Sequence, residues 1–386
     1  MYAGTFIARR IKSRERLAVV AIAVSFLVMI VAVAISAGFR AEIRRGVSSL
    51  TGDVMLTDAT FNYYGEENDI SRTPSYLEEL ENEDGVESIT AAAYRAGIVR
   101  GGSDMAGAVF KGTETGDSTL QASIPSKLAD KLGLRPGDKM TSYFIGEKVK
   151  ARNFTVKEIY DSPVEADDAM IVHVPIEDIQ RLNGWDSDRV SALEVHLDDR
   201  HSSRSGIQEA AGRLGSTAIL YAGDEDDILV ATSAPTRYAR LFDWLDLIDF
   251  NVGAILLLMT IVAGFNMISG LLILLLRNTA VIGTLKALGM TTKGIAEVFL
   301  KVSARIVLRG MAIGNAVALL FCAVQGLTHA IKLNPANYFV SFVPVRVNVP
   351  GIIAADIASF AIIMLLLLLP STFIAKVDPA ETMRSE

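Results

Sequence analysis

The chain has 386 residues, of which 51% are hydrophobic and 21% charged, and its mean hydropathy is +0.35. These values argue against an ordinary soluble globule and indicate a membrane protein with a large water-exposed part. The sequence has no basic patch interleaved with aromatic residues, which argues against a nucleic acid partner. Cys322 is the one cysteine, which excludes an intramolecular disulfide and a cysteine metal cluster.

Four apolar stretches predict transmembrane helices. The first two contain no charged side chain, and at about 1.5 Å per residue each exceeds the ~30 Å hydrocarbon core of a bilayer. The third is weaker because Asn315 and Gln325 interrupt it, and the fourth carries Asp356 near one end. The predicted spans are residues 17–39, 250–276, 310–328 and 351–370.

A cleaved signal peptide is the alternative for the first stretch. A basic region precedes it, and the tripeptide at residues 32–34, Ala-Val-Ala, resembles a cleavage site. The apolar part of a signal peptide normally has about 7–15 residues, whereas this run has 23. We therefore expect a retained span.

The distribution of charge predicts the orientation in the membrane. Residues 1–16 carry a net charge of +4 and residues 277–301 one of +3, whereas residues 40–248 hold 22 basic and 37 acidic side chains. Basic short loops stay in the cytoplasm, so we expect both termini there and residues 40–248 outside. Three arginines directly after the first span point the other way, but the loop that they open is far longer than the loops that the rule governs.

The predicted fold class is an α-helical membrane protein with four transmembrane helices and a large α+β domain between the first and the second. Residues 1–39 would hold a cytoplasmic N-terminal helix and the first span. Residues 40–248 would form the extracytoplasmic domain, with a strand-rich insertion at about 115–200. Residues 249–386 would hold the other three spans, a cytoplasmic helix and a short C-terminal tail.

Turn and capping signals predict elements within the extracytoplasmic domain. Thr73 is a plausible N-cap for a helix that Gly85 stops. Two strands are predicted on either side of the turn at residues 101–104. Residues 203–221 are predicted to form a second helix followed by a strand.

No catalytic arrangement is predicted in this domain. His196 and His201 lie in "EVHLDDRHSS", which has the composition of a metal site, but a strand that leads into a polar turn gives the same letters. The acidic run at 224–227 lacks the glycine and spacing of an EF-hand loop, and "GTETGDST" lacks the lysine of a phosphate-binding loop. We therefore expect no catalytic residue and no metal ligand, and a binding or mechanical role.

Residues 277–294 are predicted to begin with a capped helix in the loop between the second and third spans. Asn278 or Thr279 can cap its start, and Gly289 is placed to end it. Lys286 lies in its last turn, where a cation interacts favourably with the helix dipole. Thr291 or Thr292 would cap a second helix that leads into the third span.

One apolar stripe is expected on this short helix. Val281, Leu285 and Leu288 fall at positions i, i+4 and i+7, with Ile282 beside them. A helix of this kind lies either on lipid headgroups or against a partner protein. The residue pattern alone leaves both alternatives open.

Five stretches in a fixed order resemble a known family. They are "FIARR" at 6–10, "GFRAEIRRGVSSLTGDV" at 38–54, "LADKLGLRPGDKM" at 128–140, "IGTLKALGM" at 282–290 and "AKVDPAETMRSE" at 375–386. With the layout of the spans, they resemble ABC transporter permeases of the family shared by macrolide-efflux and cell-division permeases. The likeness is greatest to the lipoprotein-releasing permeases of bacterial inner membranes.

The resemblance implies that residues 279–290 couple to a separate cytoplasmic ABC ATPase. That ATPase would use ATP and Mg, while this chain would be a non-catalytic permease half that binds no cofactor. A second permease subunit, identical or paralogous, would complete the transporter. Relatives often have an acidic residue where Val281 stands, so docking here would depend more on Val281, Leu285 and Leu288.

The resemblance also implies a cargo and a location. The chain would lie in the inner membrane, surrounded by lipids, extract lipoproteins and pass them to a periplasmic carrier. Phe265, Asn266 and Ile268 of the second span are the candidates for a cargo wall, although Asn266 serves equally well for a hydrogen bond between helices. Macrolide or peptide efflux, and force transmission to a cell-wall hydrolase without transport, remain alternatives.

Overall fold

The computed structural model describes residues 16–66, 68–114, 118–146, 148–162, 170–224 and 226–371. The chain divides into two compact units. The helical unit comprises Met1–Arg40, Leu245–Lys332 and Phe342–Glu386, and the sheet unit comprises Ala41–Trp244 and Leu333–Ser341. The predicted N-terminal helix before residue 16 and the tail after residue 371, with "FIARR" and "AKVDPAETMRSE", lie outside the described residues.

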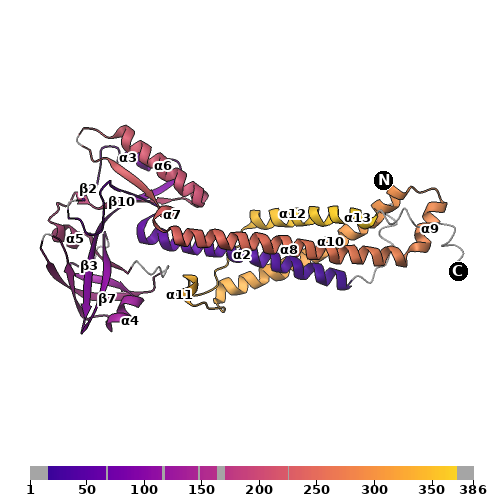
Figure 1. Cartoon of the computed structure of the whole chain (residues 1–386), viewed down its shortest axis with the longest axis horizontal. Helices are drawn as coiled ribbons and strands as arrows, with labels where there is room; N and C mark the ends of the chain where they lie inside the picture. The colour runs from indigo at the N-terminus through magenta and orange to yellow at the C-terminus, as the bar shows by residue number, and fades with distance from the viewer. Residues whose placement is uncertain are drawn as a thin grey trace. The chain divides into compact units, whose positions relative to one another are not determined.

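Four long apolar helices confirm the four predicted spans (Figure 1). The third is one uninterrupted helix despite Asn315 and Gln325, and the fourth span continues through the short helix α13 (Leu368–Ser371). The spanning helices are α2 (Arg16–Thr51), α8 (Ala239–Arg277), α10 (Thr292–Thr328) and α12 (Val349–Leu366).

Two glycines allow close packing of α10 on α2 in the helical unit. A Cβ atom on Gly310 would lie 2.6 Å from Cγ2 of Ile22, and one on Gly314 would lie 2.4 Å from the carbonyl oxygen of Ala23. Such spacing of small residues lets the backbones of membrane helices approach each other. The surrounding core includes Ile22, Phe26, Met29, Ala263, Met267, Leu271, Val298, Phe299, Val302 and Ile363.

The polar residues of α10 have specific partners. Gln325 is buried, and its amide group donates to the carbonyl of Val343 (3.0 Å) and accepts from the N–H of Ile331 (3.1 Å). These hydrogen bonds fix the segment that connects α10 to α12. This segment contains the short helix α11 (Pro335–Tyr338). Asn315 donates to Asp356 on α12 at 2.6 Å. The other oxygens of this pair, Asn315 Oδ1 and Asp356 Oδ1, are buried without a hydrogen-bond partner among the described residues.

The sheet unit is built on nine strands in the order β11-β1-β10-β3-β4-β8-β5-β7-β6, with an additional pairing of β3 with β6. Two further short strands, β2 and β9, pair with each other. The strands are β1 (Val54–Asp58), β2 (Ile70–Ser71), β3 (Val86–Gly101), β4 (Asp104–Thr113), β5 (Gln121–Pro125), β6 (Lys139–Phe144), β7 (Lys150–Tyr160), β8 (Ile171–Pro175), β9 (Arg189–Val190), β10 (Ala192–Leu197) and β11 (Leu229–Ser233).

The long strand β3 belongs to two parts of this sheet. Its first half pairs with β10, and its second half pairs with β4 and β6. The pairing with β6 closes a ring of six strands around a core that contains Phe110, Phe144 and Phe154. The predicted hairpin at residues 101–104 is confirmed, because Gly101 pairs with Asp104. Of the stretch predicted as a strand-rich insertion, β5 to β8 belong to this ring, whereas β10 pairs with β1 and β3 outside it.

The helices of the sheet unit correct two predictions. The helix expected from Thr73 begins only at Leu77, because Ser75 and Tyr76 bond to Asp226 and Asp227 far along the chain. The strand expected at the end of residues 203–221 is wrong, since the helix there continues to its last residue. The helices are α3 (Leu77–Glu81), α4 (Ser126–Leu132), α5 (Ile176–Asn183), a 3₁₀ turn (Asp199–His201), α6 (Arg204–Tyr221) and α7 (Ala234–Arg237).

Candidate functional site

The loop helix of the helical unit is α9 (Thr279–Ala287), which lies within the predicted range. Asn278 occupies the N-cap position, but its amide donates to the carbonyl of Leu274 (2.8 Å) instead of capping the helix. Gly289 adopts φ +87°, the left-handed conformation that ends helices. Thr291 then accepts a hydrogen bond from Gly294 N–H (3.2 Å) and starts α10. The helix is therefore bounded on both sides by turns that the local sequence specifies.

The structure divides the predicted apolar stripe between two faces of α9. Ile282 is completely buried in the helical core, and Leu285 is partly buried against the same core. Val281 and Leu288 are 40% and 78% exposed, and Thr284 between them is also exposed. Ile282 therefore holds the helix on its unit, while an apolar face centred on Leu288 is presented outwards. The remaining predicted residues lie at the two ends of α9: Thr279 and Lys286 are partly buried.

The cargo-wall candidates also lie on different sides of α8. Phe265 is 65% exposed and Asn266 is exposed, whereas Ile268 packs partly against the core. Among the described residues Asn266 has no hydrogen-bond partner. Phe265 belongs to an exposed apolar stripe at helical spacing, which continues through Leu258, Val262, Ile273 and Leu276.

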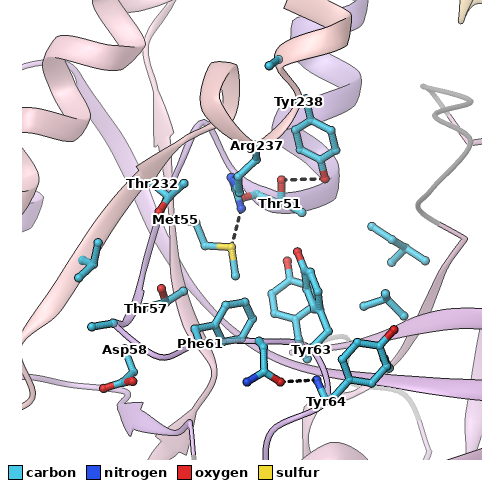
Figure 2. Close-up of a pocket in the computed structure, with 18 of the residues that line it drawn as sticks. Thr51, Met55, Thr57, Asp58, Phe61, Tyr63, Tyr64, Thr232, Arg237 and Tyr238 are labelled. Carbon is cyan, nitrogen blue, oxygen red and sulfur yellow. Dashed lines mark hydrogen bonds between the residues drawn. The ribbon is translucent and has the colours of Figure 1, made fainter.

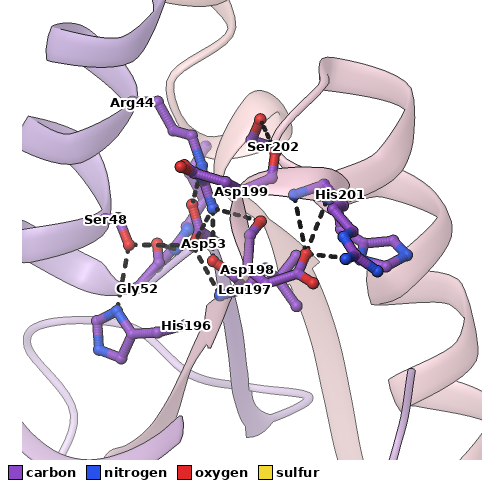
Figure 3. Close-up of polar contacts among 12 residues, drawn as sticks. Arg44, Ser48, Gly52, Asp53, His196, Leu197, Asp198, Asp199, His201 and Ser202 are labelled. Carbon is purple, nitrogen blue, oxygen red and sulfur yellow. Dashed lines mark hydrogen bonds and ion pairs between the residues drawn. The ribbon is translucent and has the colours of Figure 1, made fainter. Parts of the chain in front are cut away.

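A buried ion pair links α2 to the sheet within the sheet unit (Figure 3). Arg44 donates to both carboxylate oxygens of Asp53, each at 3.2 Å. Asp53 also accepts from Ser48 (3.0 Å) and from the backbone N–H of Leu197 (2.9 Å), and its side chain is 2% exposed. Bidentate pairing of this kind fixes geometry as well as charge. The first strand is thus tied to the end of α2, in the stretch that carried the family resemblance.

A second polar cluster covers the C-terminal end of α2. Lys111 donates to the carbonyl of Leu50 (2.7 Å) and to Glu194 (2.8 Å), and both charged side chains are almost fully buried. Tyr94 donates to the other oxygen of Glu194. Burial, and then the charge of Glu194, raises the pKa of Tyr94 well above its ordinary value. A cation on the last carbonyls of a helix is electrostatically favourable, so this cluster holds the helix end in the sheet unit.

The candidate metal ligands have other partners. His196 Nδ1 lies 3.1 Å from the hydroxyl of Ser48, and His201 Nδ1 lies 2.8 Å from Asp198. Figure 3 shows that the imidazole rings of His196 and His201 point in different directions. In the described ranges, no group of three or more potential ligands gathers around one point.

His173 on β8 makes the stability of the sheet unit depend on pH. Burial, and next the positive charge of Lys111, lowers the pKa of His173 from 6.5 to about 4. Because the unfolded chain binds this proton below about pH 6.5 and the folded chain does not, stability falls as the pH drops from 6.5 to 4. We expect His173→Phe to lose less thermal stability than the wild type between pH 7 and pH 5. Equal decreases in Tm for the two proteins would contradict this assignment.

Comparisons with known proteins agree with these features. Residues 253–379 match the FtsX-like permease C-terminal family. The lipoprotein-releasing system transmembrane protein LolC of Xylella fastidiosa is 22% identical over 278 residues, which cover 68% of this chain and 64% of the relative. LolC of Neisseria meningitidis serogroup B is 23% identical over 274 residues, with 67% and 63% covered. The chain thus spans just under two thirds of the length of these relatives.

Among solved structures, the periplasmic region of MacB from Actinobacillus actinomycetemcomitans is similar to part of the chain. The identity is 14%, the TM-score is 0.31, and the match covers 50% of this chain and 95% of that one. Residues 253–379, about a third of the chain, are therefore similar to the C-terminal part of FtsX-like permeases.

Proposed function

We infer that the chain is the membrane subunit of an ATP-driven ABC transporter, and that the exposed face of α9 binds a cytoplasmic ATPase. The observation that carries this proposal is the division of α9 into two apolar faces. Ile282 is buried in the helical unit, whereas Leu288 is exposed. An exposed apolar face on an anchored helix suits a helix-in-groove interface, in which large side chains enter a pocket of the partner. Motion of the ATPase would then be transmitted through Ile282 to the spans.

The transporter would contain a second permease subunit. The exposed stripe of α8 that includes Phe265 faces away from the core of its own unit. Such a stripe suits either a second copy or a paralogue of the chain across a lipid-filled cavity. Phe265 and Asn266 would then line the path of the cargo, with Ile268 behind them. ATP and Mg would be used by the ATPase, and this chain would carry no catalytic residue.

Lipoproteins are the cargo that we propose. The related proteins from Xylella fastidiosa and Neisseria meningitidis are named as parts of lipoprotein-releasing systems. A lipoprotein has acyl chains that prefer the bilayer and a polypeptide that prefers water. Withdrawal of the acyl chains costs about 0.8 kcal/mol for each CH₂, so release needs an energy source and an apolar acceptor. The chain would work in a bacterial inner membrane, with both termini in the cytoplasm, and would pass its cargo to a periplasmic carrier.

Reconstitution tests this proposal. The tagged chain is purified from its native membranes together with any ABC ATPase that accompanies it, and both are placed in proteoliposomes with a fluorescent triacylated lipoprotein. We expect ATP to release the lipoprotein into the soluble fraction only when a soluble acyl-binding acceptor is present. A lipoprotein that lacks its acyl chains serves as the matched control and should not stimulate ATP hydrolysis. Export of a macrolide or peptide would identify an efflux pump, and ATP hydrolysis without any transport would favour force transmission to a hydrolase.

A further inference from the structure

A cavity of about 770 Å³ lies within the sheet unit, beside β1 (Figure 2). Its walls come from the first strand and the loop after it, from β11 and from the segment at α7 that precedes α8. Cavities of roughly 300–1,000 Å³ with mainly apolar walls and a few polar groups are typical of small-molecule sites. No motif in the sequence indicated this cavity, because its walls come from segments more than 100 residues apart.

Three aromatic rings form one side of the cavity. Phe61, Tyr63 and Tyr94 contact one another edge to face, with ring centroids 5.2 to 6.3 Å apart. The hydrogen bond from Tyr94 to Glu194 fixes the position of the Tyr94 ring, against which the other two rings pack. Figure 2 shows Phe61 and Tyr63 side by side below Met55. A flat apolar body would find ring faces and ring edges here in the geometry that aromatic contacts prefer.

Arg237 supplies a positive charge at the opposite side. Its Nη2 atom donates to the carbonyl of Thr51 (3.0 Å), and Nη1 contacts the sulfur of Met55. Its Nε atom is buried without a hydrogen-bond partner. Within the described ranges no carboxylate lies at ion-pair distance from Arg237. Because Arg237 lines the cavity and has no carboxylate partner among the described residues, its charge is available to pair with an anion there.

Among the described residues of the cavity wall, the one acidic side chain, Asp58, already has hydrogen-bond partners. Asp58 accepts hydrogen bonds from the backbone N–H (2.7 Å) and the hydroxyl (2.5 Å) of Thr60. These hydrogen bonds lower the pKa of Asp58, so it stays ionised. In Figure 2 it lies beyond Phe61 as seen from Arg237. The cavity is therefore polarised, with a cation at one end and an ionised, hydrogen-bonded carboxylate at the other.

We propose that this cavity binds a small amphipathic carboxylate, with its flat apolar body against Phe61 and Tyr63 and its carboxylate on Arg237. A carboxylate accepts charge-assisted hydrogen bonds from a guanidinium group, and these are roughly twice as strong as neutral ones. The inference depends only on contacts within the sheet unit. It is therefore independent of the transporter assignment.

The test compares two probes that differ in charge. 2-Naphthoate and 2-naphthamide are titrated calorimetrically into the full-length chain in lipid nanodiscs, with empty nanodiscs as the reference. We expect naphthoate to bind at least about tenfold more tightly than naphthamide, because it alone accepts charge-assisted hydrogen bonds. Arg237→Met should remove this preference, and Phe61→Ala should weaken both probes to the same extent.

A second variant covers the case that Arg237→Met disturbs the end of α2. Val230 lines the cavity from β11 and is 44% exposed, so Val230→Trp can fill the space without changing any contact of Arg237 to Thr51. It should abolish the binding of both probes. Equal affinity of the wild type for the two probes, a preference that survives Arg237→Met, undiminished binding by Val230→Trp, or no heat above empty nanodiscs would each overturn the proposal. Recovery of the ATPase with Val230→Trp should be unchanged, which separates this proposal from the transporter assignment.

Discussion

Replacement of Leu288 by aspartate is expected to release the proposed ATPase partner from the chain. Leu288 directly follows α9 and is 78% exposed, so the substitution removes no contact of the helical core. In a docked complex, however, a large apolar side chain contributes about 1.5–3 kcal/mol when fully buried, and an unpaired charge in the same pocket costs considerably more. We therefore expect a loss of affinity of at least about a hundredfold, with no ATPase recovered with the tagged chain and no stimulation of ATP hydrolysis by cargo.

The controls for this prediction follow from the position of each side chain on α9. Leu285→Asp is less informative than its place in the stripe suggested, because Leu285 packs partly against the core and its loss would also disturb the unit. Lys286→Ala lies off the exposed apolar face and should have little effect on ATPase recovery. If α9 instead lies on lipid headgroups, Leu288→Asp should weaken membrane contact but leave the ATPase attached. Normal recovery of the ATPase with Leu288→Asp would therefore remove α9 as the coupling helix.

Loss of Asn315 is expected to destabilise the helical unit strongly. Its amide is the donor to Asp356 between α10 and α12, at 2.6 Å. Asn315→Leu would leave the carboxyl group of Asp356 without this partner in an apolar environment. Removing one partner of a buried hydrogen-bonded group costs about 1–3 kcal/mol, and more for a charged group, and we expect a destabilisation of this order. Unfolding of the purified chain by increasing fractions of sodium dodecyl sulfate in mixed micelles would measure it.

Asp356→Asn is expected to have the opposite effect, although it removes a charged group. The new amide could accept from Asn315 and also donate to it, which would satisfy Asn315 Oδ1, now buried without a partner among the described residues. Hydrogen bonds between membrane helices contribute roughly 0.6–2 kcal/mol, so a modest gain in stability should follow. A destabilisation by Asp356→Asn as large as that of Asn315→Leu would show that the charge itself, rather than the pairing, is required.

Features set by local sequence could be predicted. Long apolar runs identified the four spans, because few other structures tolerate such runs. Gly289 ends one helix and Thr291 starts the next through local conformation and bonds to near neighbours. Their roles could therefore be predicted from the sequence. The close contact of α10 with α2 was missed, although "GMAIG" at residues 310–314 has the spacing typical of helix packing in membranes.

Features set by distant contacts could not be predicted. Ser75 and Tyr76, which follow the expected helix start at Thr73, bond to Asp226 and Asp227 about 150 residues away, and no local rule reveals such bonds. The periodicity of α9 indicated an apolar stripe, but it could not show that Ile282 would face the core and Leu288 the outside. The cavity beside β1 was invisible for the same reason, since Phe61 and Arg237 meet only in the folded sheet unit.

The strand order of the sheet unit has a consequence for biosynthesis. Among the described strands, β1 pairs only with β10 and β11, which are the last two of them to be translated. The ribosome adds about 5–20 residues per second, so on the order of ten to thirty seconds pass between the synthesis of β1 and that of β11. During this interval the apolar strand "VML" at residues 54–56, already outside the membrane if the first span has inserted, has neither neighbour. Nascent chains of this protein would therefore depend on an extracytoplasmic chaperone, and its depletion should cause loss of the full-length chain by proteolysis before β11 emerges.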